Sequence, residues 1–90
     1  MRLPVIKSVT QFIEANDEDY VIETMEVLEH LAENGKLKDE EIDVIGELLS
    51  NMSGAIEVAK LIREGETPSK ALNQFMSRVM GSFDPKTEDS

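Results

Sequence analysis

The residues of this sequence that are best suited to chemistry form one row between residues 19 and 33. The members of this acidic row, spaced by 4, 3, 4 and 3 residues, are Asp19, Glu23, Glu26, His30 and Glu33. Such spacing places them along one side of an α-helix. Carboxylates and imidazole both bind divalent metal ions, so this side could hold an isolated ion. The ordinary alternative is an acidic face that is simply solvated.

A metal centre of a known helical type is not expected on the acidic row. Di-metal centres in helical bundles take a Glu-x-x-His pair from each of two helices. This sequence has a single histidine, and Val27 stands three residues before it. The stretch NDEDYVIETMEV also lacks the alternating oxygen ligands and central glycine of a calcium-binding loop. We therefore predict no metal site.

Enzymatic chemistry finds no other support in the residue types. The sequence contains no cysteine, which removes disulfides, thiolate metal sites and thiol nucleophiles. It also has no glycine-flanked serine elbow and no glycine-rich loop that would cradle a phosphate. We predict no catalytic residue, no cofactor and no enzyme activity.

The negative charge of the chain is concentrated in its middle. The net charge is −10, and residues 14 to 47 contain thirteen acidic residues against two lysines, Lys36 and Lys38. Nucleic acids and anionic lipids bind Lys and Arg, so neither is expected as a partner. A basic surface of another protein is allowed. The opening residues MRLPVIKSVTQFIEAN form neither a secretion signal nor a membrane span, and we expect a cytoplasmic protein.

Apolar periodicity and capping signals predict helices throughout. We expect a first helix over residues 4 to 15 that Asn16 closes in a left-handed conformation. Asp17 should cap a second helix, which stops at Asn34 and Gly35. A third helix is expected over residues 39 to 64, with its cap at residue 38 or 39, and a fourth from the Thr67-Pro68 pair to Gly81. The predicted fold is an all-α, small four-helix domain with a long central third helix over residues 1 to 81, followed by a flexible tail over residues 82 to 90.

The third helix contains a cluster of small residues that would weaken it unless they serve a contact. Apolar residues keep spacings of 3, 4, 3, 4 and 3 from Ile42 to Ala59, so we expect one continuous helix rather than two. Its apolar positions cover a wide arc, which indicates contacts with several helices. The small residues fall on the remaining side and predict a homodimer or partner contact; the interface candidates are Gly46, Ser50, Ser53, Gly54 and Glu57. A local kink or close packing of the first helix are the alternatives.

Nearly the whole chain resembles a family of short, acidic bacterial helical proteins of unknown function. The resemblance lies in the stretches LPVIK, NDEDYVIET, LKDEEIDVIGELLSNM, GAIEV and FMSRVMGS. It implies no catalytic residue, and it suggests that members of the family are encoded near thioredoxin-like and peroxiredoxin proteins. Without cysteine, such a link means an accessory or binding role.

We therefore expect a non-enzymatic helical interaction module that self-associates, and the resemblance suggests that it is an accessory to thiol-redox or peroxide-defence proteins. The alternative is a small-molecule or metal-binding helical protein that uses Glu23, Glu26 and His30.

Overall fold

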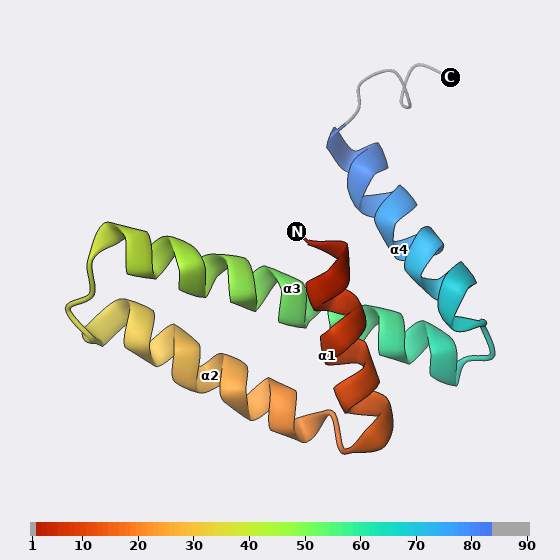
Figure 1. The fold of residues 1–90 in the computed structure, drawn as a ribbon, viewed down its shortest axis with the longest axis horizontal. Helices are drawn as coiled ribbons and strands as arrows, with labels where there is room; N and C mark the ends of the chain where they lie inside the picture. The colour runs from red at the N-terminus through yellow and green to blue at the C-terminus, as the bar shows by residue number, and fades with distance from the viewer. Residues whose placement is uncertain (1, 84–90) are drawn as a thin grey trace. The chain divides into compact units, whose positions relative to one another are not determined.

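The computed structural model describes the backbone from residue 2 to residue 83 and the side chains from residue 2 to residue 79. Over these residues the chain forms four α-helices (Figure 1). They are α1 (Leu3–Ala15), α2 (Asp19–Asn34), α3 (Asp39–Arg63) and α4 (Pro68–Phe83). The predicted all-α fold with a long third helix is confirmed.

The backbone divides into two compact units, Met1–Ile56 and Glu57–Ser90. The first unit contains α1, α2 and α3 up to Ile56, and the second contains the end of α3 together with α4. A single domain over residues 1–81 stays a prediction.

The continuity of α3 through its small residues is confirmed. The helix runs without interruption from Asp39 to Arg63 and includes Ser50–Ala55. It contacts each of the other helices. In the first unit it bonds to α1 through Asn51 and lies beside α2 around Val44, and in the second unit its Glu57 forms an ion pair with Arg78 of α4. The unbroken apolar spacing therefore predicted correctly that this segment is one continuous helix.

The junction between α1 and α2 departs from the expected left-handed cap. Asn16 is extended, with φ −137° and ψ −164°, so that prediction is wrong. Its backbone N–H and side-chain Nδ2 both donate to the carbonyl oxygen of Phe12, at 2.9 and 3.2 Å. The free carbonyl is thus satisfied without a left-handed residue. Asp17 was predicted as the N-cap, but that position is Glu18, which makes no side-chain cap bond. Asp17 lies one residue earlier, and its Oδ1 accepts a hydrogen bond from the Asp19 N–H at 3.1 Å.

The turn between α2 and α3 uses Gly35 for space and Lys36 for its conformation. A Cβ on Gly35 would lie 2.6 Å from the carbonyl oxygen of Leu31, whereas Lys36 adopts the positive φ of 55°. Lys38 precedes α3, and its backbone N–H donates to Glu41 Oε1 at 2.9 Å. This bond is the reciprocal half of a capping box, which explains how a lysine can stand at this position.

The turn after α3 follows the expected signals, and the end of α4 does not. Gly65 has a φ of 112°, and Thr67 Oγ1 accepts a hydrogen bond from the Lys70 N–H at 3.2 Å. The helix continues through Gly81 to Phe83. Gly81 was therefore wrongly predicted as the stop, since glycine weakens a helix by about 1 kcal/mol without ending it. Residues 84–90 of the predicted tail lie outside the described residues.

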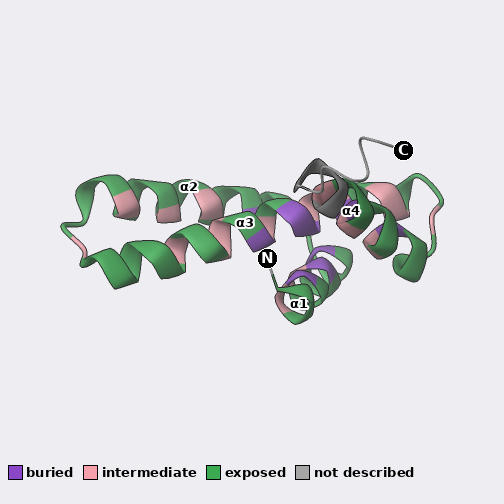
Figure 2. Cartoon of the chain, turned by 90° about the horizontal axis from the view of Figure 1, so that it is seen from above, coloured by how far each residue is buried: buried purple, intermediate pink, exposed green. Residues whose placement is uncertain are grey.

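The buried side chains of the first unit lie mostly on α1 and on the part of α3 beside it (Figure 2), with one on α2. They are Ile6, Thr10, Ile13, Val21, Asn51 and Ala55. By contrast, no residue from Ile22 to Ser50 is buried. The greater part of α2 and the first half of α3 thus pair with each other without a covering layer.

Candidate protein-interaction surface

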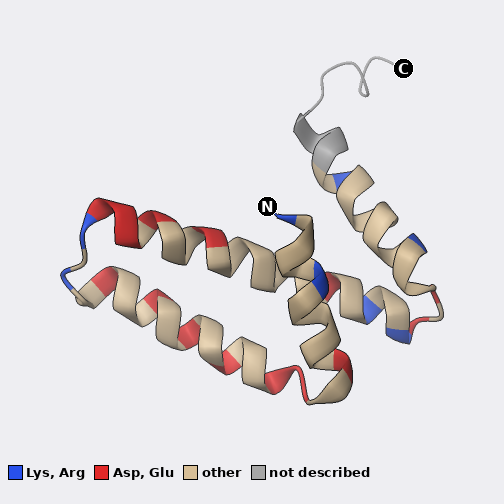
Figure 3. Cartoon of the chain, viewed as in Figure 1, with Lys and Arg blue, Asp and Glu red and all other residues tan. Residues whose placement is uncertain are grey.

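The acidic row lies on the solvent side of α2. Every member of the row is exposed, and the carboxylates are spread along the helix (Figure 3). The His30 ring has Asn34 as its neighbour, with Nδ2 of Asn34 3.4 Å from Nδ1 of His30. Among the described residues, no group of three or more His, Asp or Glu side chains has the arrangement of a metal site. The structure does not gather the row into a pocket.

The small-residue candidates on α3 are divided between exposed and buried positions. Gly46, Ser50 and Ser53 are exposed, and a Cβ on Gly46 would meet no described atom within 4 Å. Gly54 is buried. Glu57 belongs to the second unit, where it pairs with Arg78. The small-residue candidates therefore do not form one open surface, and no described helix approaches α3 at Gly46.

A different surface emerges on the pair formed by α2 and α3. Val27 and Leu31 lie four residues apart on α2 and are 59% and 40% exposed, while Val44 on α3 is 59% exposed. Residues four apart share one helix face. Apolar residues of both helices and of the turn between them form what we call the apolar strip, which consists of Val27, Leu31, Leu37, Val44 and Leu48. Leu37 and Leu48 are half-buried, and the other three are exposed.

Two adjoining grooves run along the apolar strip. The outer groove, of about 440 Å³, is lined by residues of both helices and of their turn, namely Leu31, Leu37, Glu40, Glu41, Val44 and Ile45. The inner groove, of about 330 Å³, reaches α1 and is lined by Arg2, Val5, Asp43, Val44, Glu47, Leu48 and Asn51. Val44 lines both grooves, so they adjoin at this residue, and we call the two grooves together the channel.

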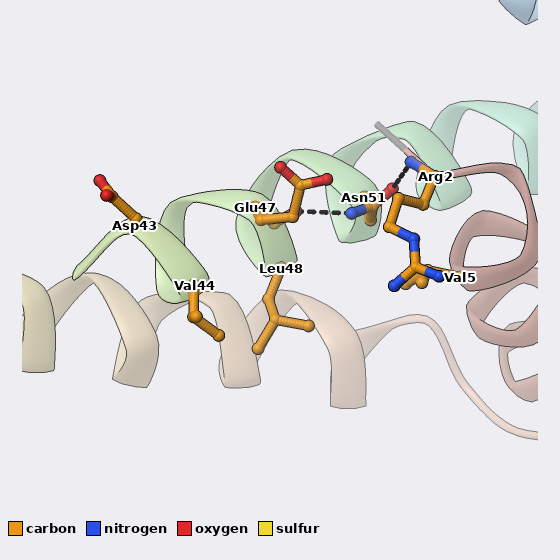
Figure 4. A pocket seen from close by; sticks show the side chains of 7 residues that line it. All are labelled: Arg2, Val5, Asp43, Val44, Glu47, Leu48 and Asn51. Carbon is orange, nitrogen blue, oxygen red and sulfur yellow. Dashed lines mark hydrogen bonds between the residues drawn. The ribbon is translucent and has the colours of Figure 1, made fainter. Parts of the chain in front are cut away.

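Carboxylates border the apolar strip along α3. Figure 4 shows Val44 and Leu48 pointing toward α2, whereas Asp43 points away from α2. Asp43 and Glu47 line the inner groove. Glu40 and Glu41 line the outer groove, where the helix begins. An apolar floor with a polar border is the usual composition of a protein interface, since the apolar centre supplies contact area and the rim stays hydrated.

The inner end of the channel is fixed by a buried amide. Asn51 is completely buried, and its Oδ1 accepts a hydrogen bond from the Arg2 N–H at 2.8 Å (Figure 4). Its Nδ2 donates to the Glu47 carbonyl oxygen at 2.7 Å. The Asn51 side chain of α3 therefore satisfies a free backbone N–H at the start of α1. This bond sets where α1 crosses the α2–α3 pair.

An aromatic contact closes α1 against the start of α2. The rings of Phe12 and Tyr20 meet edge to face, with centroids 6.0 Å apart and planes at 84°. Helix α1 is thus attached at both ends to one side of the α2–α3 pair. The apolar strip is the remainder of that side, beyond the reach of α1.

Residues 1–84 match the sequence profile of a family of unknown function, DUF6952. The chain belongs to this family. The match covers all four helices. The family description gives no activity, ligand or partner. No curated protein and no solved structure shows significant similarity to the chain. Within the described residues, none of the helices has the length and apolar character needed to cross a membrane.

The sequence contained one signal for the apolar strip, the wide apolar arc of α3, but the arc was taken to mean that several helices cover α3. Val44 and Leu48 belong to this arc, yet Val44 is 59% exposed. The arc was wider than the contacts within the first unit require. Periodicity reports which residues avoid water but cannot report whether a neighbour in the same chain covers them.

Proposed function

We propose that the chain is a helical protein-interaction module and that the apolar strip is its docking surface. The observation that carries the proposal is the exposure of apolar side chains on both helices of one pair, with Val27 and Val44 each 59% exposed. Single exposed apolar residues are ordinary on protein surfaces, whereas a contiguous apolar patch with a polar rim marks an interaction site. The two adjoining grooves connect Leu31, Val44 and Leu48. Val27 extends the patch along α2, because it lies one helical turn before Leu31.

The rest of the first unit supports a scaffold that presents this surface. Asn51 and the Phe12–Tyr20 contact hold α1 across one end of the helix pair, while residues 22–50 contain no buried side chain. Burial of the exposed parts of the strip would stabilise a complex by about 25 cal/mol for each Å² removed from water, before the costs of association. An accessory role beside thiol-redox or peroxide-defence proteins would be one instance of this function.

Site-specific photocrosslinking in the cell that makes the protein tests the proposal. A benzophenone amino acid replaces Val27 in one variant and Val44 in another, and a matched control carries it at Ser53, which is also exposed but lies outside the strip. Covalent adducts with one partner protein at Val27 and Val44, and none at Ser53, are the expected result. Equal labelling at all three positions, or none at any, would contradict a docking role for the strip.

Self-association through the small residues is a second candidate. This self-association is supported by the open space around Gly46 and by the exposure of Ser50 and Ser53. Small residues on an exposed helix face leave room for the close approach of another helix. Gly54 is buried and is not available for that contact. The expected result is a dimeric mass in light scattering that Gly46→Leu with Ser50→Leu reduces to a monomer. A monomeric mass for the unaltered chain would remove this candidate.

A further inference from the structure

We infer that the partner on the apolar strip is a basic amphipathic α-helix of another protein. The inference rests on the proposed function and adds to it the shape and charge of the occupant. Three features of the first unit lead to it: the grooves lie between packed helices, α1 already occupies the neighbouring position, and the charged residues that line the grooves are acidic apart from Arg2.

The shape of the surface fits a helix. The channel follows α3, which runs beside α2 (Figure 1). Its outer part is lined also by Leu31 of α2, and its inner part by Val5 of α1. Helix α1 demonstrates how a helix uses this side of the pair, because it buries Ile6 and Ile13 there. An amphipathic helix bound beside α1 would place residues at i, i+3, i+4 and i+7 on the strip. It would provide the covering layer that residues 22–50 lack.

The charge of the surface selects a basic partner. Glu40, Glu41 and Asp43 line the channel on the α3 side, and the helix pair carries most of the acidic residues of the chain (Figure 3). The cationic residues close to the channel are Arg2 at its inner end and Lys36 and Lys38 in the turn. Lys and Arg on both flanks of a bound helix would meet these carboxylates and steer its approach.

The same charges disfavour a second copy of the chain on the strip. A symmetric dimer places the same patch on both sides of the interface, so the borders of two strips would bring glutamates and aspartates together. Like charges at an interface cost binding energy and reject wrong partners. A basic helix gains the apolar contact without this repulsion.

The test measures the binding of labelled peptides to the whole chain by fluorescence anisotropy at low ionic strength. The first peptide is a helix of about 15 residues with leucine at i, i+3, i+4 and i+7 and lysine elsewhere. The second replaces each lysine with glutamate, and the third has the composition of the first in an order without an apolar face. We expect the first peptide to bind at least about tenfold more tightly than either of the others. Equal affinity for the glutamate peptide or for the reordered peptide would overturn the inference.

Paired variants locate the peptide on the strip. Val27→Asp with Val44→Asp should weaken binding of the lysine peptide by about tenfold or more, whereas Ser50→Asp with Ser53→Asp, which adds the same charge outside the strip, should leave it nearly unchanged. Both replaced sets are exposed, and circular dichroism confirms that each variant folds. Equal effects of the two pairs would show that the peptide responds to net charge alone and would overturn the inference.

A second pair isolates the contribution of the border charges. Glu40→Gln with Asp43→Asn should weaken binding about threefold to tenfold, and Glu29→Gln with Glu33→Gln, which removes as much charge elsewhere on the pair, should weaken it less than twofold. Unchanged affinity for the first pair would contradict a basic partner. If all peptides fail to bind while photocrosslinks at Val27 and Val44 persist, the basic-helix inference fails and the proposed function stands. Photocrosslinks from the strip to another copy of the chain would also overturn the basic-helix inference and leave the proposed docking function standing.

Discussion

Asn51 of α3 accepts a hydrogen bond from the backbone N–H of Arg2 at 2.8 Å and is itself fully buried. The bond joins residues far apart in the sequence and caps the first turn of α1. Asn51 also lines the inner end of the channel, beside Leu48. One buried amide therefore positions the helix that leaves the apolar strip uncovered.

Replacing this amide should destabilise the protein. Asn51→Leu removes the acceptor for the Arg2 N–H and the donor to the Glu47 carbonyl, and we expect a loss of about 1–3 kcal/mol in the free energy of unfolding. Urea denaturation followed by circular dichroism measures it. Asn34→Leu is the matched control, because Asn34 is exposed and bonds only within α2, and it should change stability by less than about 0.5 kcal/mol. Equal losses would argue against the tie between α1 and α3.

The residues of the strip should contribute little to folding. Val27 is exposed and alanine favours helices more than valine does, so Val27→Ala should leave the free energy of unfolding unchanged or raise it by about 0.5 kcal/mol. Val21→Ala on the same helix removes a buried side chain and should cost about 1–3 kcal/mol. The same urea titration compares them. A loss for Val27→Ala as large as that for Val21→Ala would mean that the strip is part of the core.

Glycines in the two kinds of environment should respond in opposite directions to alanine. Gly46 lies within α3 with open space around its Cβ position, so Gly46→Ala should raise the free energy of unfolding by about 0.5–1 kcal/mol. Thermal unfolding detects the change as a higher Tm. An unchanged or lower Tm would indicate that a close contact occupies this position.

Gly65 provides the opposite case. Its φ of 112° is a conformation that residues with a Cβ rarely adopt, so Gly65→Ala should lower the free energy of unfolding by about 1–2 kcal/mol. A stabilising effect would show that the turn between α3 and α4 relaxes to a negative φ.

The ion pair of the second unit should be of minor importance. Glu57 and Arg78 are half-exposed, with side chains 46% and 59% accessible, and surface pairs contribute about 0–1 kcal/mol. Glu57→Gln should therefore lower stability by less than about 1 kcal/mol, an effect that 0.5 M salt should reduce further. A loss above about 2 kcal/mol would assign Glu57 a structural role in this unit.

The fold could be predicted from the sequence where local signals decide the structure. The unbroken apolar spacing of α3 and the turn signals Gly65 and Thr67-Pro68 act through neighbouring backbone groups, and the structure has each of them. Predictions failed where an alternative local bond was available. Asn16 satisfies the Phe12 carbonyl in an extended conformation, and α4 tolerates Gly81.

The candidate surface was only partly accessible to sequence reasoning. The acidic helices were evident, but charge patterning alone does not distinguish a solvated face from the border of a groove. Val44 was assigned to the wide apolar arc of α3, which predicted that neighbouring helices cover it, and Val27 was considered only for its spacing from His30. The exposure of both residues depends on where α1 crosses. That crossing is set by Asn51, a long-range contact that has no sequence signature.

The most direct test of the docking surface is a chemical-shift map of the ¹⁵N-labelled chain during titration with the leucine-lysine peptide. We predict saturable shifts centred on Val27, Leu31, Val44 and Leu48, and small changes at Gly46, Ser50 and Ser53 on the other side of α3. Shifts centred on the small residues, or weak shifts spread over every acidic segment without saturation, would contradict the account.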